Sequence, residues 1–153
     1  MPARFDKLGI SFLYPDNWTL DDSDALLGRQ AVTVYSPGGA FWSVAIHSGS
    51  ASPAKLAAAA VEALRKEYAW LEAEETQETI VGYDLVGYDL AFYYLDLTNT
   101  ALIRSLQVAH AAYTIYCQAE DREFEQVKLV FQAMTTSLLN GLAVSSGQTS
   151  HAT

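Results

Sequence analysis

Apolar and polar side chains alternate over most of residues 84–118, and this is the most informative pattern in the chain. Because successive side chains of a β-strand point to opposite faces of a sheet, the alternation predicts three consecutive antiparallel strands. We place them at residues 86–97, 101–109 and 112–118. The polar triplet 98–100 is typical of a hairpin turn and separates the first two strands.

The register of these strands follows from burial, because a one-residue slip would expose the whole apolar set. The apolar faces match when Leu90 and Phe92 lie near Leu106. That register brings Arg104, which falls on the apolar face, close to Asp96. A buried cation needs a partner, so we predict an Asp96–Arg104 ion pair with a structural role.

The remaining elements are predicted from local patterns. A strand over 9–14 stops at Pro15, and Ser36-Pro37-Gly38-Gly39 indicates a hairpin between strands 30–35 and 41–47. Ser52-Pro53 is a typical helix start. The charged segment 72–79 reads as an edge strand. A final helix is predicted from Asp121 to about Asn140-Gly141. We expect one core that contains the following residues: Phe12, Trp42, Leu90, Phe92, Leu106, Ile115, Val127 and Phe131.

Length and charge narrow the classes of protein. The chain has 153 residues, half of them apolar, which suits one globular domain over residues 1–140 with a flexible tail at 141–153. Its formal net charge of −9 argues against nucleic acid and anionic membranes as partners. The N-terminus shows no signal-peptide pattern, and the apolar stretch 56–64 is too short to span a bilayer. We expect a cytoplasmic protein.

The opening segment carries a pattern found in a known family. It has the form Gly-x-x-Phe-x-Tyr-Pro-x-x-Trp, with the residues Gly9, Phe12, Tyr14, Pro15 and Trp18. With the element order and the closing Thr136-Ser137-Leu138, it resembles the PsbP-like superfamily over about residues 5–140. The superfamily includes extrinsic photosystem II subunits and a Ran-release factor. The resemblance implies an α+β sandwich, with a central antiparallel sheet flanked by helices, and a role as a binding or assembly partner.

Residues able to carry chemistry do not form a recognisable motif. The candidate metal ligands are spread over several predicted elements without a metal-binding spacing, so we expect no metal and no cofactor; they are His47, His110, Cys117, Asp89 and Asp96. Cys117 is the only cysteine, and its apolar strand neighbours predict a buried, unreactive thiol. Asp89 and Asp96 would point to opposite faces of one strand and cannot share a proton. No catalytic residue is assigned.

Tyrosine is the more suggestive residue type. Several of the nine tyrosines crowd one stretch, including Tyr93 and Tyr94, and tyrosine favours interfaces. We therefore favour a non-enzymatic binding or assembly module, whose partner is another protein or a second copy of itself. The alternative is a small-molecule-binding or enzymatic cleft around Asp89, Tyr93 and Arg104. The predicted ligand or partner surface comprises these residues: Asp89, Tyr93, Tyr94, Asp96 and Arg104.

Overall fold

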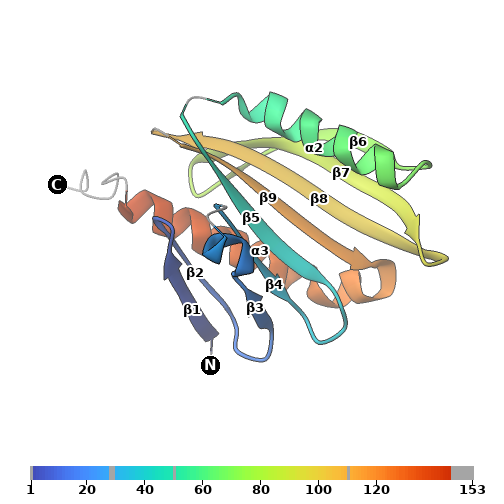
Figure 1. The fold of residues 1–153 in the computed structure, drawn as a ribbon, viewed down its shortest axis with the longest axis horizontal. Helices are drawn as coiled ribbons and strands as arrows, with labels where there is room; N and C mark the ends of the chain where they lie inside the picture. Colours follow the sequence, from blue (N-terminus) through green and yellow to red (C-terminus); the bar gives the residue numbers. More distant parts are fainter. Residues whose placement is uncertain (1, 28–29, 50, 110, 146–153) are drawn as a thin grey trace.

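The computed structural model describes residues 2–27, 30–49, 51–109 and 111–145, which form two sheets and three helices (Figure 1). The strands are β1 (Pro2–Lys7), β2 (Ile10–Pro15), β3 (Thr19–Asp21), β4 (Ala31–Tyr35), β5 (Phe41–Ser48), β6 (Glu72–Ile80), β7 (Tyr83–Tyr94), β8 (Leu97–Val108) and β9 (Ala111–Glu120). The helices are α1 (Ser23–Leu26), α2 (Pro53–Glu67) and α3 (Asp121–Ser145).

The main sheet has seven strands in the order β3-β4-β5-β9-β8-β7-β6, and every neighbouring pair is antiparallel. Its long-range join is the β5–β9 pair, in which Trp42 lies opposite Cys117. Strands β1 and β2 form a separate hairpin. The predicted α+β architecture, a central antiparallel sheet flanked by helices, is confirmed. The predicted edge strand is also confirmed, because β6 closes one side of the sheet.

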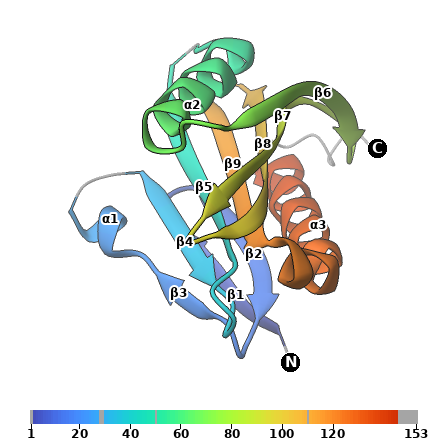
Figure 2. The same cartoon turned by 90° about the vertical axis from the view of Figure 1, so that its right-hand side faces the viewer.

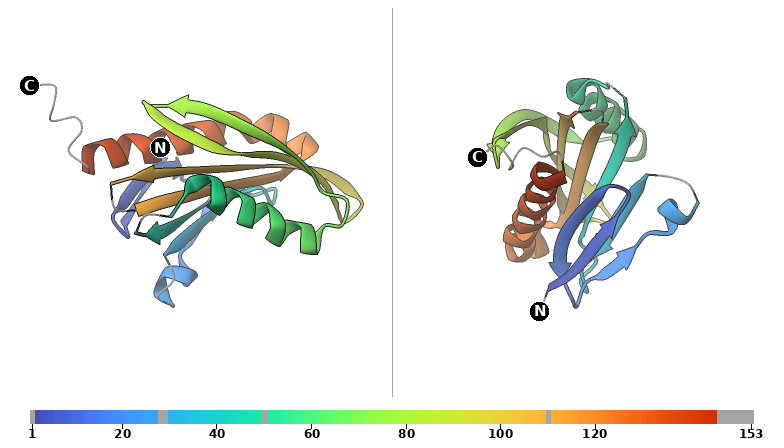
Figure 3. Two further views of the ribbon diagram at one scale, coloured as in Figure 1. Left: turned by 90° about the horizontal axis from the view of Figure 1, so that it is seen from above. Right: turned by 90° about the vertical axis from the view of Figure 1, so that its left-hand side faces the viewer.

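The sheet is covered on both faces, so the protein has two hydrophobic cores. In Figure 3, α2 lies on one side of the sheet, and α3 lies on the other. The larger core, between the sheet and α3 with the β1–β2 hairpin, is built around Trp42, Phe12 and Phe131. The smaller core lies under α2 and contains Phe92 and Val61.

The prediction of a single core was therefore wrong for part of its residues. Leu90 and Phe92 are buried, but they belong to the core under α2. Val127 of α3 is only half-buried at the edge of the larger core. The other five predicted residues are buried together in the larger core. Alternation along a strand separates two faces, and it cannot tell whether one or both of them are covered.

The predicted register between the first two strands of the meander is also wrong. β7 ends at Tyr94, and the turn consists of Leu95 and Asp96, both with positive φ (54° and 63°), as a two-residue type I′ turn requires. Leu90 consequently pairs with Ala101 and not with a residue near Leu106. The polar triplet 98–100 belongs to β8, directly after its first residue Leu97. Asn99 within it is buried, and its side-chain amide donates to the Leu97 carbonyl at 3.0 Å.

The last helix continues past the predicted stop. α3 runs to Ser145, with Leu142 and Ala143 buried, so residues 141–145 of the expected tail are helical. Gly141 does not end the helix. A Cβ atom at this position would lie 2.7 Å from the Ser11 carbonyl oxygen, so glycine allows α3 to pass close to β2. Residues 146–153 lie outside the described part of the chain.

α3 is also longer and more apolar than the segment considered from the sequence. By length and composition alone, Asp121–Val144 could cross a membrane. In the fold, the apolar face of α3 packs on the sheet, with side chains such as Phe131, Met134 and Leu138 buried in the larger core. The start of α2 is confirmed, since Ser52 Oγ accepts a hydrogen bond from the Lys55 amide and Pro53 occupies the first turn.

The close approach at Gly141 leads to a testable expectation. Alanine is the better helix former, so Gly141→Ala in an unconstrained helix would stabilise the protein by about 1 kcal/mol. Here the added methyl group meets backbone of β2, and overpacking of this kind costs about 1–3 kcal/mol. We expect a net loss of unfolding free energy in urea titrations. Asn140→Ala, the exposed neighbour, is the matched control and should be neutral or slightly stabilising. A more stable Gly141→Ala variant would contradict the close contact.

Candidate partner-binding surface

Arg104 is the most buried charged residue among the predicted site residues, at 9% exposed, and its guanidinium is almost fully engaged. Nε donates to a Glu78 carboxylate oxygen, and Nη2 donates to Asp89 Oδ1 at 2.8 Å. Nη1 donates to the backbone carbonyls of Tyr88 and Ile103 at 3.3 and 3.0 Å. Arg104 therefore joins β6, β7 and β8 on the face that α3 covers.

The predicted Asp96–Arg104 pair is wrong. Asp96 lies in the β7–β8 turn, whereas Arg104 stands opposite Gly87 well inside the sheet. The error follows directly from the register, because the turn is at residues 95–96 and not at 98–100. The acid that the sequence placed on another face, Asp89, is the true partner on β7.

The Arg104 cluster has the character of a structural clasp. Burial by itself lowers the pKa of the guanidinium, but the hydrogen bonds and charges of Glu78 and Asp89 outweigh this effect and hold the pKa above its usual value. Four donor contacts are already made inside the protein, which leaves little capacity for a ligand. Tyr93, the third residue of the predicted cleft, lies opposite Thr98 and four positions along β7 from Asp89, so the three do not converge.

Cys117 lies next to this cluster and is buried, as predicted. It lines a cavity of about 270 Å³ between α3 and the sheet, together with Arg104 and Lys128. Burial raises the pKa of the thiol well above its usual range, and the charge of Arg104 opposes this only in part. A thiol held in the protonated form is a poor nucleophile.

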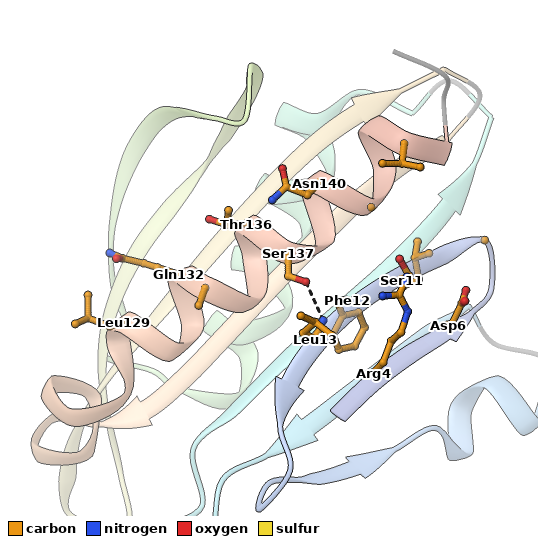
Figure 4. A pocket seen from close by; sticks show the side chains of 15 residues that line it. Arg4, Asp6, Ser11, Phe12, Leu13, Leu129, Gln132, Thr136, Ser137 and Asn140 are labelled. Carbon is orange, nitrogen blue, oxygen red and sulfur yellow. Dashed lines mark hydrogen bonds between the residues drawn. The ribbon is translucent and has the colours of Figure 1, made fainter. Parts of the chain in front are cut away.

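A wide groove runs between α3 and the β1–β2 hairpin, with a volume of about 910 Å³ (Figure 4). The floor is fixed where the Leu13 amide donates to Ser137 Oγ at 2.8 Å. Its rim is polar, with Gln132 and Asn140 on α3 and Arg4 on β1. A second, more apolar cavity of about 560 Å³ continues it around Leu129 and Pro15. The sequence did not predict this groove, because the separate β1–β2 hairpin and its contact with α3 are tertiary features.

A second surface collects exposed apolar side chains at one end of the molecule. We call it the hairpin-tip surface and define it by these residues, with their exposed fractions: Trp70 (84%), Tyr93 (65%), Tyr94 (47%), Leu95 (76%) and Leu97 (44%). It combines the β7–β8 hairpin with the α2–β6 connection, at the right-hand end of the sheet in Figure 1 and facing the viewer in Figure 2. A cavity of about 570 Å³ lies within it, lined by Trp70, Tyr93, Thr98 and Asp121 among others.

Trp70 is held in place by well-anchored neighbours. Leu71 is buried, and its amide donates to the Tyr68 carbonyl at 3.2 Å, which closes a turn around Ala69 and Trp70. Arg65 Nη1 donates to the Leu71 carbonyl at 3.0 Å. The Tyr68 ring stacks on Phe92 with centroids 4.3 Å apart. Trp70 is thus exposed on a turn whose two ends, Tyr68 and Leu71, pack in the core under α2.

Leu95 is exposed at a position that does not suit leucine. Its φ of 54° is in the left-handed region, which is unfavourable for branched and bulky side chains. Type I′ turns prefer asparagine or glycine here. Leu8 occupies the corresponding place in the β1–β2 hairpin, but its side chain packs against the larger core. Strained backbone positions often cluster at functional sites. Leu95 shares its strain with Val81, which is exposed in the β6–β7 turn and also has a φ of 54°.

The structure divides the predicted surface residues between two places. Tyr93, Tyr94 and Asp96 lie at the hairpin tip, whereas Asp89 and Arg104 lie in the clasp. Sequence reasoning missed Trp70, Leu95 and Leu97. Only Trp70 gave a signal in the sequence, because this large aromatic residue follows the end of α2 and does not continue the apolar face of that helix. Among the described residues, no three of His, Cys, Asp and Glu lie close enough to hold a metal ion; His110 lies outside that part of the chain.

Solved structures of known proteins share this architecture. The cyanobacterial PsbP protein (CyanoP) of Synechocystis sp. PCC 6803 aligns with a TM-score of 0.61 and 14% identity, over 89% of this chain and 90% of that one. The Ran-binding protein Mog1p of Saccharomyces cerevisiae aligns with a TM-score of 0.56 and 11% identity, over 95% and 94%. The chain has the PsbP-like fold. The resemblance expected from residues 5–140 is therefore confirmed at the level of fold.

A third neighbour is the Pseudomonas aeruginosa protein PA94, described as a putative regulator of unknown function, with a TM-score of 0.58 and 12% identity over 90% of this chain and 95% of that one. No protein-family model and no curated protein matches the sequence. Structural similarity at such low sequence identity supports a shared fold and does not assign an activity.

The Arg104 clasp predicts a clear order of mutational effects. Arg104→Met leaves two carboxylates and two carbonyls without their donor, so we expect a loss of about 2–4 kcal/mol of unfolding free energy. Asp89→Asn should cost about 1 kcal/mol or less, because that carboxylate is half-exposed and Glu78 remains. Asp96→Asn should stay within about 0.5 kcal/mol of the original protein. Urea unfolding measures all three. A loss on Asp96→Asn as large as that on Arg104→Met would contradict the structure and favour the Asp96–Arg104 pair.

Proposed function

We propose that the protein is a binding or assembly module that docks a protein partner on the hairpin-tip surface. The observation that carries this proposal is Trp70, 84% exposed on a pinned turn. Tryptophan and tyrosine dominate the energetics of protein interfaces, and a rigid anchor loses little entropy on binding. Trp70 and Tyr93 supply two such anchors at one cavity, and Tyr94 adds a third on the opposite face of β7 at the same hairpin tip.

Two further observations support a protein partner over a small molecule. Arg104 of the predicted cleft is already paired with Asp89 and with Glu78, which leaves Arg104 and Asp89 poorly suited to bind a ligand. Among proteins with the same fold, Mog1p is a Ran-binding protein. That activity belongs to Mog1p, but it supports binding as a use of this fold. We propose no catalytic step.

Affinity capture with variants of the protein tests the proposal. The baits are the original protein, Trp70→Ala and Leu129→Ala, the last being a similarly exposed residue on α3 in the other groove. Both substitutions should leave stability within about 0.5 kcal/mol, because neither side chain packs in the core. We expect quantitative mass spectrometry of lysate from the source cells to find proteins that both the original and Leu129→Ala baits retain and that Trp70→Ala loses.

Trp70 also reports binding directly once such a protein is purified. Trp18 and Trp42 are buried, so acrylamide should quench chiefly the emission of Trp70 in the free protein. Partner binding should shift that emission to shorter wavelength and protect it from acrylamide. A partner that binds Trp70→Ala as tightly as the original protein, without protection of Trp70, would place docking elsewhere and contradict the proposal.

Leu95 provides a variant in which stability and binding should change in opposite directions. Leu95→Asn places a residue suited to positive φ in the turn, and we expect the protein to gain about 0.5–1 kcal/mol of stability. The same change removes an exposed apolar side chain and should weaken partner binding. Thermal unfolding and the fluorescence assay measure the two effects. Loss of stability in Leu95→Asn, or unchanged binding, would count against a binding role for this residue.

A further inference from the structure

The hairpin-tip surface has acidic side chains around its apolar residues. Glu72 and Asp121 line the cavity that contains Trp70 and Tyr93. Asp96 occupies the turn between Leu95 and Leu97. Glu67 is the last residue of α2 and lies near Tyr68. Burial is the main cause that raises the pKa of Tyr68, and the negative charge of Glu67 raises it further. Glu72 and Asp121 thus lie at the cavity itself, Asp96 lies in the turn of the exposed hairpin, and Glu67 lies three residues before Trp70; we call these four acids the rim.

The cations in the same part of the fold do not neutralise this rim. Arg65 donates to the Leu71 carbonyl and lies 3.8 Å from Glu62. Arg122 is paired with Glu120 at 2.8 Å. Lys66 lies on the last turn of α2, and the four rim acids outnumber it. The local excess of negative charge has the same sign as the formal net charge of −9.

From this charge pattern we infer that the occupant of the hairpin-tip surface is a basic protein segment, with an apolar or aromatic side chain that enters the cavity beside Trp70 and with Lys or Arg residues that face Glu67, Glu72, Asp96 and Asp121. This inference rests on the proposed docking function and specifies its partner. Complementary charge at the rim of an interface speeds association and excludes partners of the wrong sign.

A second copy of the chain is a poor occupant of the same surface. In a two-fold symmetric dimer, each patch meets itself, so the four rim acids of one copy would face those of the other. Like charges brought together at an interface oppose association. The self-association that the sequence left open is thus disfavoured at this surface in comparison with a basic partner.

The charge around Trp70 can be measured without any partner. Caesium and iodide ions quench tryptophan by collision, and a negative field raises the local concentration of the cation and lowers that of the anion. Each ion is compared with its own quenching of free N-acetyltryptophanamide, because caesium quenches less efficiently per collision than iodide. On this scale we expect Trp70 to be more accessible to caesium than to iodide at low ionic strength. The triple variant Glu67→Gln, Glu72→Gln, Asp96→Asn should remove the difference. Equal normalised quenching by the two ions in the original protein would overturn the inference.

The chemistry of the partner is tested with a random peptide library displayed on phage, selected on the original protein after removal of phage that bind Trp70→Ala. We expect the Trp70-dependent peptides to combine an aromatic or apolar residue with an excess of Lys and Arg. A synthetic peptide from this set should bind the triple variant about tenfold more weakly and lose affinity as salt rises. Asp6→Asn, Glu75→Gln, Asp84→Asn is the control, with the same change of net charge at exposed acids elsewhere.

The outcomes separate the inference from the function on which it rests. Trp70-dependent peptides with neutral or acidic flanks, bound equally well by the triple variant, would retain the docking surface and overturn the basic partner. If the triple variant and its control lose the same affinity for the peptide, the loss reflects net charge alone, and the inference of a basic partner is also overturned. Failure to obtain any Trp70-dependent peptide would count against the docking surface itself, and the inference would fall with it.

Discussion

The exposed hairpin tip depends on a difference in length, because strands β7 and β8 are longer than helix α2, which covers one of their faces. β7 and β8 have 12 residues each, and α2 has 15. At about 3.3 Å per strand residue and 1.5 Å per helix residue, the strands extend about 40 Å and the helix only about 22 Å. The hairpin that joins β7 and β8 therefore reaches past the end of α2 (Figure 1). Side chains at its tip have little helix left to cover them.

Apolar residues at that tip would ordinarily be a liability for solubility. Tyr93, Leu95 and Leu97 are nevertheless kept exposed, and the α2–β6 connection adds Trp70 to them. The Tyr68–Phe92 stack and the Arg65–Leu71 hydrogen bond fix the backbone beside Trp70. The same core under α2 thus stabilises the sheet and positions the exposed aromatic surface. The nearby acids offset the solubility cost, and in the proposed function they would select a partner of positive charge.

The extent to which the sequence predicted this structure depends on which physical signal each element carries. Alternation of side chains predicted the strands of the central meander, because burial on a sheet enforces a period of two. The turn was misplaced because its two residues, Leu95 and Asp96, adopt positive φ although neither is glycine or asparagine. The polar triplet 98–100, in contrast, has the composition of a turn but lies in a strand. One misplaced turn then moved Arg104 to the wrong acid. Gly141 was read as a helix stop, although its role is the contact with Ser11, which no local pattern records.

The surface was predictable only in part for a similar reason. Tyr93 and Tyr94 were identified from the crowding of tyrosines, a composition signal. Trp70 becomes significant only when its neighbours Tyr68 and Leu71 are seen to be anchored and the indole itself to be exposed. Exposure of one side chain beside buried neighbours is a property of the folded chain. The PsbP-like fold was predictable from the order of elements, because that order survives errors of register.

The claim that the hairpin tip is exposed and yet rigid is tested most directly by backbone ¹⁵N relaxation in the free protein. Order parameters near 0.85 at Ala69, Trp70 and Leu95, equal to those of the central strands β8 and β9, are expected for a surface that is organised before binding. Values below about 0.6 at these residues would describe a loose loop and hairpin tip. The exposure of Trp70 would then reflect local disorder, and the case for a preformed partner-binding surface would be contradicted.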